Sequence, residues 1–426
     1  MLTRFVHFDE MNLVLRYGVD SQVELGLADE AVVAECGMPR GSPIRDVSTA
    51  TAASLRSPLE YPSLADATTP ADRIVVVLES GVPQVEPIVA AVIGCLVEAG
   101  VDPDGLTLLR TPTDVESGRG DPRRDLPEAL KRSIPVITHE PDNRRKMAYL
   151  AATRHGDPVF LNRAITDADV VVPIGRIRSA ASPGYHGMNG VVFPAFSDHP
   201  TQQRFRTPPG EGEKSHQARL VVECDEVGWL LGVTFAVGIV PGPGEEILEV
   251  LAGEIGAVRA HGRELYEQAW WHTVPRKASL VVAAIQGGAS QQTWQNVGTA
   301  LDLAGELVEE GGAIAVCCDL SAQPGPAVQH LIGARSRQIA MRQIRKDRAE
   351  DVLQATQLAR ALDRADVYLL SRLDHAMVED LEMAPISNTA ELVRLAHRHQ
   401  SCILVSNAPN AIVTVEKKAG RMREEG

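Results

Sequence analysis

Runs of apolar, β-branched residues recur in the first half of the chain, with helical spacing between some of them. The clearest runs are residues 73–78 (RIVVVL) and 169–174 (DVVVPI). Continuous runs of this kind are typical of strands buried on both faces of a sheet. Residues 87–98 have helical spacing, stop at Gly100, and precede a strand expected at 106–109. This order predicts a βαβ unit with a right-handed crossover.

The alternation of strands and helices begins again near residue 275. Strands are expected at 279–284, 313–318, 366–370 and 402–405, and helices at 293–309, 349–363 and 389–398. The pattern predicts two α/β domains with mostly parallel sheets and a cleft between them. Their expected bounds are residues 1–272 and 273–405.

Two segments between these blocks have a less regular pattern. Residues 220–224 and 230–237 are expected to pair as antiparallel strands on either side of a turn at 225–226. Residues 245–271 are expected to form one long helix, or two, because glycines 256 and 262 are weak points within it.

Composition and charge narrow the class of protein. Hydrophobic residues make up 44% of the 426 residues and aromatic residues only 4%, so the core must consist mostly of aliphatic side chains. The 42 basic and 56 acidic residues give a formal net charge of −14. No basic face is evident, which argues against a nucleic-acid partner. The sequence has no apolar run of about 18 residues and no leader-like start, so no membrane span and a cytoplasmic location are expected.

The six cysteines are expected to be reduced core residues. None of them forms a CxxC pair, and Cys317 and Cys318 end an apolar run that indicates a buried strand. A metal site formed by these two thiols is disfavoured, because adjacent side chains on a strand point to opposite faces.

Several segments, in this order and spacing, resemble the nickel-dependent lactate racemase (LarA-like) family over roughly residues 10–410. They are RIVVVLESGVPQVEPIVAAVIGCLVEAGVDPDGLTLL, MAYLAATRHGDPVFLNRAITDADVVVPIGRI, GYHGMNGVVFPAFSD, AAIQGGASQQTWQNVGTALDLAGELVEEGGAIAV and DVYLLSRLDHAMVEDLEM. The resemblance implies a two-domain fold in which residues 406–426 pack back on the first domain. It also implies a nickel-pincer nucleotide bound covalently to a lysine, which carries hydride while a pair of histidines handles the hydroxyl proton.

The positions that carry this chemistry in the family are altered here. The lysine that would anchor the cofactor falls on Gly190, and the two proton-transfer histidines fall on Asp114 and Ala180. The nickel-binding histidine falls near Arg206. The aspartate and arginine of the family's phosphate-binding turn fall on Glu79 and Val82, and a second lysine falls on Gly298. His139 and Gln295 match the family. The cofactor of this chain is therefore left unknown.

The glycine-rich block after residues 169–174 contains His186, a candidate proton-transfer group, between Tyr185 and Gly187. Ligands of open α/β sheets bind at the carboxyl ends of strands, where this block is expected. Tyr185 and Asn189 are expected to contact the ligand from the same block. The alternative is that His186 is a turn residue without a role.

Basic residues follow a second candidate histidine. His199 is followed by Arg204 and Arg206, whose guanidinium groups could bind a carboxylate or phosphate. The alternative is a solvated loop.

Three further segments supply candidates. Ser80 and Gly81 could bind an anion before a helix, although a plain turn is the alternative. Asp114 could act as a general base or remain a solvated loop charge. Gln295 could donate amide hydrogen bonds from the second domain.

The resemblance, together with these candidate residues, implies an isomerase, a racemase or epimerase, that acts on a small 2-hydroxy acid or sugar acid in the interdomain cleft. A ligand-binding or sensor protein without catalysis is the alternative. A nicotinamide-dependent dehydrogenase is disfavoured because no GxGxxG fingerprint is present. A small organic anion is the expected partner, no metal ligand is assigned, and an oligomer remains possible.

Overall fold

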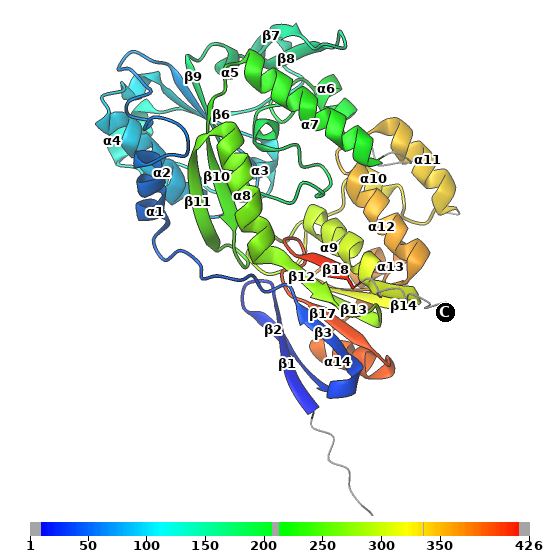
Figure 1. Cartoon of the computed structure of the whole chain (residues 1–426). Helices are drawn as coiled ribbons and strands as arrows, with labels where there is room; N and C mark the ends of the chain where they lie inside the picture. Colours follow the sequence, from blue (N-terminus) through cyan, green and yellow to red (C-terminus); the bar gives the residue numbers. More distant parts are fainter. Residues whose placement is uncertain (1–9, 207–212, 335, 417–426) are drawn as a thin grey trace, which may run out of the picture.

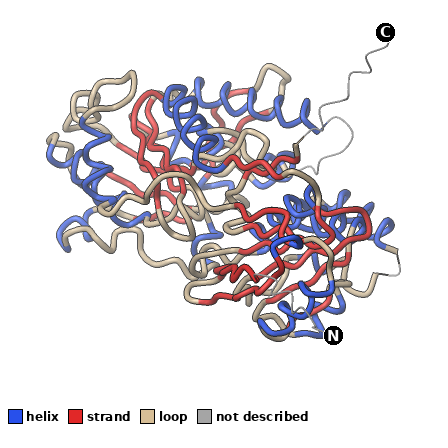
Figure 2. Tube along the Cα trace, turned by 60° about the horizontal axis from the view of Figure 1, so that its bottom comes forward, coloured by secondary structure: helices blue, strands red, loops and turns tan. Residues whose placement is uncertain are grey.

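The computed structural model describes residues 10–206, 213–334 and 336–416. The strands form two six-stranded sheets and three two-stranded ones. Figures 1 and 2 show the two large sheets in separate parts of the molecule, each covered by helices. The mixed α/β class with mostly parallel sheets agrees with the expectation.

Domain 1 is built around the first sheet, which runs in the order β11-β10-β9-β4-β5-β6. All neighbours are parallel except β10 and β11. The strands are β4 (Ile74–Leu78), β5 (Leu106–Arg110), β6 (Val136–Thr138), β9 (Val170–Arg176), β10 (Phe235–Pro241) and β11 (Ile247–Glu254). The helices are α1 (Val47–Arg56), α2 (Val85–Glu98), α3 (Pro112–Glu116), α4 (Glu128–Ser133), α5 (Arg163–Thr166), α6 (His199–Phe205), α7 (Glu213–Leu230) and α8 (Ile255–Trp270). An antiparallel pair, β7 (Met147–Ala152) and β8 (Pro158–Asn162), completes the domain.

The central strand β4 shows why its apolar run is continuous. Ile74, Val76 and Leu78 belong to the core cluster that includes α1 and α2 residues. Val75 and Val77 face the opposite cluster, which includes residues of α5 and α8. Because successive side chains of a strand alternate between faces, both faces must be apolar when helices cover both.

Domain 2 is built around an all-parallel sheet in the order β16-β15-β14-β13-β17-β3. The strands are β3 (Val32–Cys36), β13 (Ala278–Ala284), β14 (Val308–Cys317), β15 (Asp366–Leu370), β16 (Ala384–Ile386) and β17 (Cys402–Val405). The helices are α9 (Trp294–Leu307), α10 (Pro326–Gln329), α11 (Arg337–Asp347), α12 (Val352–Arg364), α13 (His375–Asp380) and α14 (Thr389–Arg398). Cys317 and Cys318 are buried in the clusters on the two opposite faces of this sheet.

The start of the chain packs with domain 2, which differs from the expected first domain of residues 1–272. The hairpin of β1 (Glu10–Tyr17) and β2 (Ser21–Ala28) buries its apolar side chains against domain 2, and β3 pairs with β17. Figure 1 shows this hairpin at the end of domain 2 that is remote from domain 1. The sequence pattern could not show this, because an edge strand from a distant segment carries no local signal of its partner.

The end of the chain lies at the junction of the two domains. The strand β18 (Ile412–Val415) pairs with β12 (Trp271–Val274). Its Ile412 packs on a domain 1 cluster, whereas Val413 belongs to a domain 2 cluster. The expected packing of residues 406–426 on domain 1 therefore covers only part of what β18 contacts, and residues 417–426 lie outside the described ones.

Two expected elements are wrong. Residues 220–224 lie within the helix α7, in which Leu220, Cys224 and Val227 are buried together. The segment expected as a helix from residue 245 begins with the strand β11, and the helix α8 starts only after Glu254, whose side chain accepts a hydrogen bond from the amide of Ala257.

None of the described helices has both the length and the apolar character needed to cross a bilayer.

Candidate functional site

A cavity of about 610 Å³ lies between the two domains. Domain 1 contributes the segments that follow β4, β5 and β9, together with residues of α6 and α7. Domain 2 contributes Gln295 of α9 and the residues around the start of α12. The carboxyl ends of adjacent parallel strands thus form one wall, as in other open α/β sheets.

Two arginines and one glutamate form the wall at the ends of β4 and β9. Glu79 follows β4, Arg176 ends β9, and Arg178 lies two residues further on. The Glu79 carboxylate accepts a hydrogen bond from the Arg176 amide at 2.6 Å and one from the Arg178 guanidinium at 2.5 Å. One carboxylate therefore binds one guanidinium group, that of Arg178, and the backbone amide of Arg176. Burial, followed by the charge of Arg178, lowers the pKa of Arg176 to about 10.

His186 lines the cavity as a neutral imidazole at pH 7. Its side chain is 8% exposed and packs edge-on against Phe205, with ring centroids 5.2 Å apart. Burial, then the positive charges of Arg178 and His216, lower the pKa of His186 to about 4. Its Nε2 is buried and has no hydrogen-bond partner. A neutral imidazole nitrogen in this state can accept a proton or a hydrogen bond from a ligand.

His199 and Arg206 also line the cavity, at the two ends of α6. The Nε2 of His199 pairs with the amide of Gln203 at 2.8 Å. Arg206 donates from Nη2 to Gln202 and, across the domain boundary, to Glu350, at 3.0 Å each. Arg206 is thus a link between the domains, although its buried Nη1 has no partner.

Buried polar atoms without hydrogen-bond partners gather around this cavity. Such atoms occur on these described residues of its lining: Thr111, Arg176, Arg178, His186, Arg206, His216 and Gln354. A buried polar atom that lacks a partner is costly, and native proteins leave few of them. Their concentration here indicates a site for a polar ligand that satisfies them.

The turn after β4 is held by Asp114 rather than left open for an anion. The Asp114 carboxylate accepts hydrogen bonds from the Ser80 hydroxyl at 3.0 Å and the Gly81 amide at 3.4 Å. Ser80 lines the main cavity, but Gly81 and Asp114 do not. Burial raises the pKa of Asp114, opposed by Arg119 and these hydrogen bonds. The geometry gives Asp114 an anchoring role and does not place it as a general base in the main cavity.

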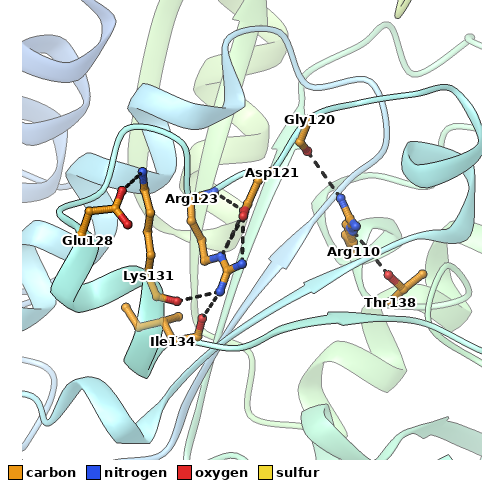
Figure 3. Close-up of polar contacts among 8 residues, drawn as sticks. All are labelled: Arg110, Gly120, Asp121, Arg123, Glu128, Lys131, Ile134 and Thr138. Carbon is orange, nitrogen blue, oxygen red and sulfur yellow. Dashed lines mark hydrogen bonds and ion pairs between the residues drawn. The ribbon is translucent and has the colours of Figure 1, made fainter.

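A smaller cavity of about 200 Å³ adjoins the main one and contains Asp114 and Arg110 in its lining. Arg110 lies between the carbonyl of Gly120 and the hydroxyl of Thr138, 3.4 Å from each (Figure 3). In the same view Arg123 donates to the carbonyls of Lys131 and Ile134, among other contacts (Figure 3). These bonds fix the segment between β5 and β6 that forms the floor of both cavities.

Three expected ligand-binding residues do not line the cavity. Arg204 forms ion pairs with Glu223 and, at 3.7 Å, with Asp157. The Asn189 amide donates to Asp225 at 2.9 Å. Tyr185 is buried beneath Arg178, whose guanidinium carbon lies 5.8 Å from the ring centroid. These side chains are taken up by neighbours within domain 1, a property that the sequence does not display.

Comparison with known proteins finds a family match over part of the chain and a shared fold over most of it. Residues 17–205 match the family model of the lactate racemase N-terminal domain. The whole structure is similar to the lactate racemase apoprotein of Thermoanaerobacterium thermosaccharolyticum, with a TM-score of 0.75 over 95% of this chain and 100% of that one, at 16% identity. The family match covers less than half of the chain, so it shows a segment similar to the lactate racemase N-terminal domain, and the structural match shows a shared fold.

A second solved structure agrees in fold. A protein from Thermotoga maritima matches with a TM-score of 0.63 and 12% identity, over 88% of this chain and 100% of its own. At these identities the structural matches show a shared fold. No curated protein matches the sequence.

The residues of this chain do not fit the covalently bound nickel-pincer nucleotide that the resemblance implies. Gly190 replaces the anchoring lysine, and a Cβ there would lie only 2.9 Å from the Cβ of His186. At Gly298, the other lysine position, a Cβ would lie 2.3 Å from Oε1 of Gln357. No group of three or more His, Cys, Asp or Glu side chains able to hold a metal occurs among the described residues. A side chain at position 190 would therefore displace His186, and one at position 298 would require the Gln357 amide to move. The described residues thus offer neither the lysine anchor nor a metal-binding group for that nucleotide.

The structure brings together several expected residues and adds others. His186, His199, Ser80, Arg206 and Gln295 all line one cavity. The sequence-based expectations did not include Arg176, Arg178, His216 and Gln354. The two arginines had a signal, since charged residues spaced by two directly at the end of a buried strand share one side. His216 and Gln354 had none, because their approach depends on how the domains pack.

Proposed function

We propose that this LarA-like protein is an isomerase that inverts the hydroxyl-bearing carbon of a small hydroxy acid in the interdomain cavity. The observation that carries the proposal is the gathering of unpartnered polar atoms around that cavity, next to two arginines of which only Arg178 is paired with the Glu79 carboxylate. Arginine guanidinium groups suit a carboxylate, and the neutral His186 suits removal of the proton from the neighbouring hydroxyl-bearing carbon.

His186 is the proposed proton-handling residue. The neutral Nε2 would remove the proton from the hydroxyl-bearing carbon, and the electron pair of that C–H bond would move into the carboxylate held by Arg176 and Arg178. A proton returned from solvent to the opposite face of the carbon, while His186 releases its own proton to solvent, restores the C–H bond, so substrate and product have the same atoms and oxidation state. Its edge-on contact with Phe205 and its burial keep the ring oriented and shield the nitrogen from water.

The activity is tested with single enantiomers of lactate, malate and tartrate and with sugar acids that carry deuterium on the hydroxyl carbon. Chiral chromatography should detect the inverted product. Mass spectrometry then separates hydride transfer, in which the label is retained, from proton abstraction, in which it exchanges with solvent. H186Q should lower the rate by about 10²-fold or more, the usual contribution of a general base. The exposed His155 supplies the control H155Q, which should leave the rate unchanged.

A binding protein without catalysis is the second candidate. It is favoured by Gly190 and Gly298, which stand where the resemblance implies lysines and where an added Cβ would meet neighbouring side chains. Saturable binding by calorimetry, with no inversion and no label exchange for any bound acid, would support it and remove the isomerase proposal.

We further propose that no cofactor is attached through a lysine link and that nickel is not bound stoichiometrically. The intact mass of the protein isolated under denaturing conditions should equal that of the chain, 45.9 kDa, and elemental analysis should find no nickel equivalent. A covalent mass addition, or one nickel per chain, would contradict the argument from Gly190 and Gly298.

A further inference from the structure

Arg176 and Arg178 present two guanidinium groups to one side of the cavity. They are separated by one residue at the end of a strand, and both line the cavity. The Nε of each is buried without a hydrogen-bond partner. Two adjacent guanidinium groups with unused donors match the two oxygens of a carboxylate.

The side chains of Arg176, Arg178 and Glu79 together carry one net positive charge, which one anion would balance. Glu79 neutralises Arg178 through a direct hydrogen bond, but it contacts Arg176 only through the backbone amide. No ion pair of the Arg176 guanidinium occurs within the described part of the chain. One positive charge is therefore left uncompensated at a half-buried position, and a ligand carboxylate would compensate it.

The absence of a side chain at Gly81 allows the Arg176 guanidinium to lie against the backbone of the turn. A Cβ at this position would lie 3.2 Å from Nη2 of Arg176, and the φ of +78° is one that residues with side chains rarely adopt. The backbone of the turn after β4 thus allows the guanidinium to lie close against it while facing the cavity.

The rest of the cavity wall carries hydrogen-bonding atoms that suit the hydroxyl groups of a ligand. Oε1 of Gln354 accepts hydrogen bonds, and the Nε2 atoms of His186 and His216 donate or accept according to tautomer; all three are buried without partners. A hydroxyl group can donate and accept, so it suits both kinds of atom. The volume of about 610 Å³ also falls within the range of pockets for drug-sized ligands, well above the need of a three-carbon acid.

We propose that Arg176 and Arg178 clamp the carboxylate of a polyhydroxy acid of about six carbons, whose hydroxyl groups reach His186, His216 and Gln354. The inference rests on the proposed function, because it names the substrate class of the same cavity. It assigns the carboxylate to the end of β9 and the far end of the ligand to domain 2.

Calorimetry on the full chain tests the ligand class. D-Gluconate, D-galactonate and D-mannonate are compared with L-lactate and D-lactate, and with D-glucitol, which has the hydroxyl chain without the carboxylate. Two or more additional hydrogen bonds should make at least one six-carbon acid bind about tenfold more tightly than either lactate. D-Glucitol should show no binding at millimolar concentration.

Variants test the two ends of the cavity separately. R176Q should weaken binding of the best six-carbon acid by about 100-fold, because a buried charge-assisted pair is lost. R178Q is tested together with E79Q, because R178Q alone would leave the Glu79 carboxylate without the guanidinium group that pairs with it. Q354L should weaken that acid by about tenfold while leaving lactate unchanged. The exposed pair of Arg73 and Asp169 supplies the control R73Q. Thermal unfolding of each variant confirms that it is folded.

Equal affinity for lactate and all three six-carbon acids would overturn the inference, and so would full binding by a folded R176Q. These results differ from failure of the proposed function. Tight binding of a six-carbon acid without inversion would contradict the proposed isomerase function but support the proposed ligand class. Inversion of lactate without any preference for longer acids would support the isomerase function but contradict the ligand class.

Discussion

At the scale of single residues, the cavity is defined by groups whose ordinary partners are missing. His186 and Arg176 both have pKa values lowered chiefly by burial, to about 4 and about 10. Burial without a partner disfavours the charged form, so His186 is kept neutral, whereas Arg176 stays charged at pH 7. The site therefore combines a fixed positive charge with a neutral base, and each of these properties comes from its surroundings.

The His186 imidazole should make the stability of the protein depend on pH. The unfolded chain takes up a proton on this residue near pH 6.5, whereas the folded chain does so only near pH 4. Stability is therefore fully present above pH 6.5 and decreases as the pH falls through this window. The shift corresponds to about 3 kcal/mol of unfolding free energy. Urea unfolding between pH 7.5 and 4.5 should show a smaller decrease for H186Q than for the unaltered chain.

The control for this measurement is H155Q, which alters an exposed histidine outside the cavity. Arg178 and His216 are the charged groups that act on His186, so R178Q combined with E79Q should narrow the window. An identical pH dependence for H186Q and the unaltered chain would show that His186 titrates normally.

At the scale of elements, the buried parallel strands could be predicted from sequence, and the amphipathic segments around the site only in part. Every residue of strand β4 is apolar because both of its faces are buried, so its sequence indicates a buried strand directly. The sequence predicts a strand at residues 220–224, within the helix α7, because Leu220, Val221 and Val222 form a short apolar run. Its buried residues at positions 220, 224 and 227 have helical spacing, but the exposed Val222 and Trp229 obscure that pattern. Contacts with domain 1 decide the outcome.

Asp114 should stabilise the turn between β4 and α2 through its acceptor oxygens, and its negative charge should not be needed for this. D114A removes the acceptor of the Ser80 hydroxyl and the Gly81 amide, and should lower the free energy of unfolding by about 1–3 kcal/mol. D114N keeps an acceptor oxygen and removes a buried charge whose pKa is already raised, so it should be about as stable as the unaltered chain at pH 7.

Urea unfolding measures both variants, with D125A at a half-exposed ion pair with Arg124 as the control. The activity of D114N separates anchoring from catalysis. A general base would lose its function on this change, whereas an anchor would keep it; a stable but inactive D114N would restore Asp114 to the catalytic residues.

At the scale of the whole molecule, the family resemblance located the cavity, and the packing of the domains completed it. The order of sequence segments led to the lactate racemase fold, and Gln295 was found in the cavity as expected. The contribution of Glu350 and Gln354 could not be predicted, because the approach of α12 to α6 is set by contacts between residues more than a hundred positions apart. The same holds for β3, whose partner β17 lies near the other end of the chain.

The placement of β1, β2 and β3 predicts how the chain can be divided. A fragment of residues 40–275 keeps the sheet of domain 1 intact, whereas a fragment of residues 1–272 carries a hairpin whose apolar face has lost domain 2. The longer fragment should bind more of a hydrophobic dye and aggregate at lower concentration than the shorter one. Dye fluorescence and light scattering compare them, and equal behaviour would show that the hairpin does not depend on domain 2.

The pairing of β3 with β17 has a consequence for synthesis on the ribosome. Residues 32–36 emerge early, but their partner, residues 402–405, is made only after nearly the whole chain has been translated. Domain 1 has all its strands once residue 254 is out and can fold as a unit in the meantime. The first segment of the nascent chain must therefore wait, with its apolar hairpin uncovered, while about 150 further residues are added at roughly 5–20 residues per second. A protein that binds nascent chains would find its target in this hairpin during that interval.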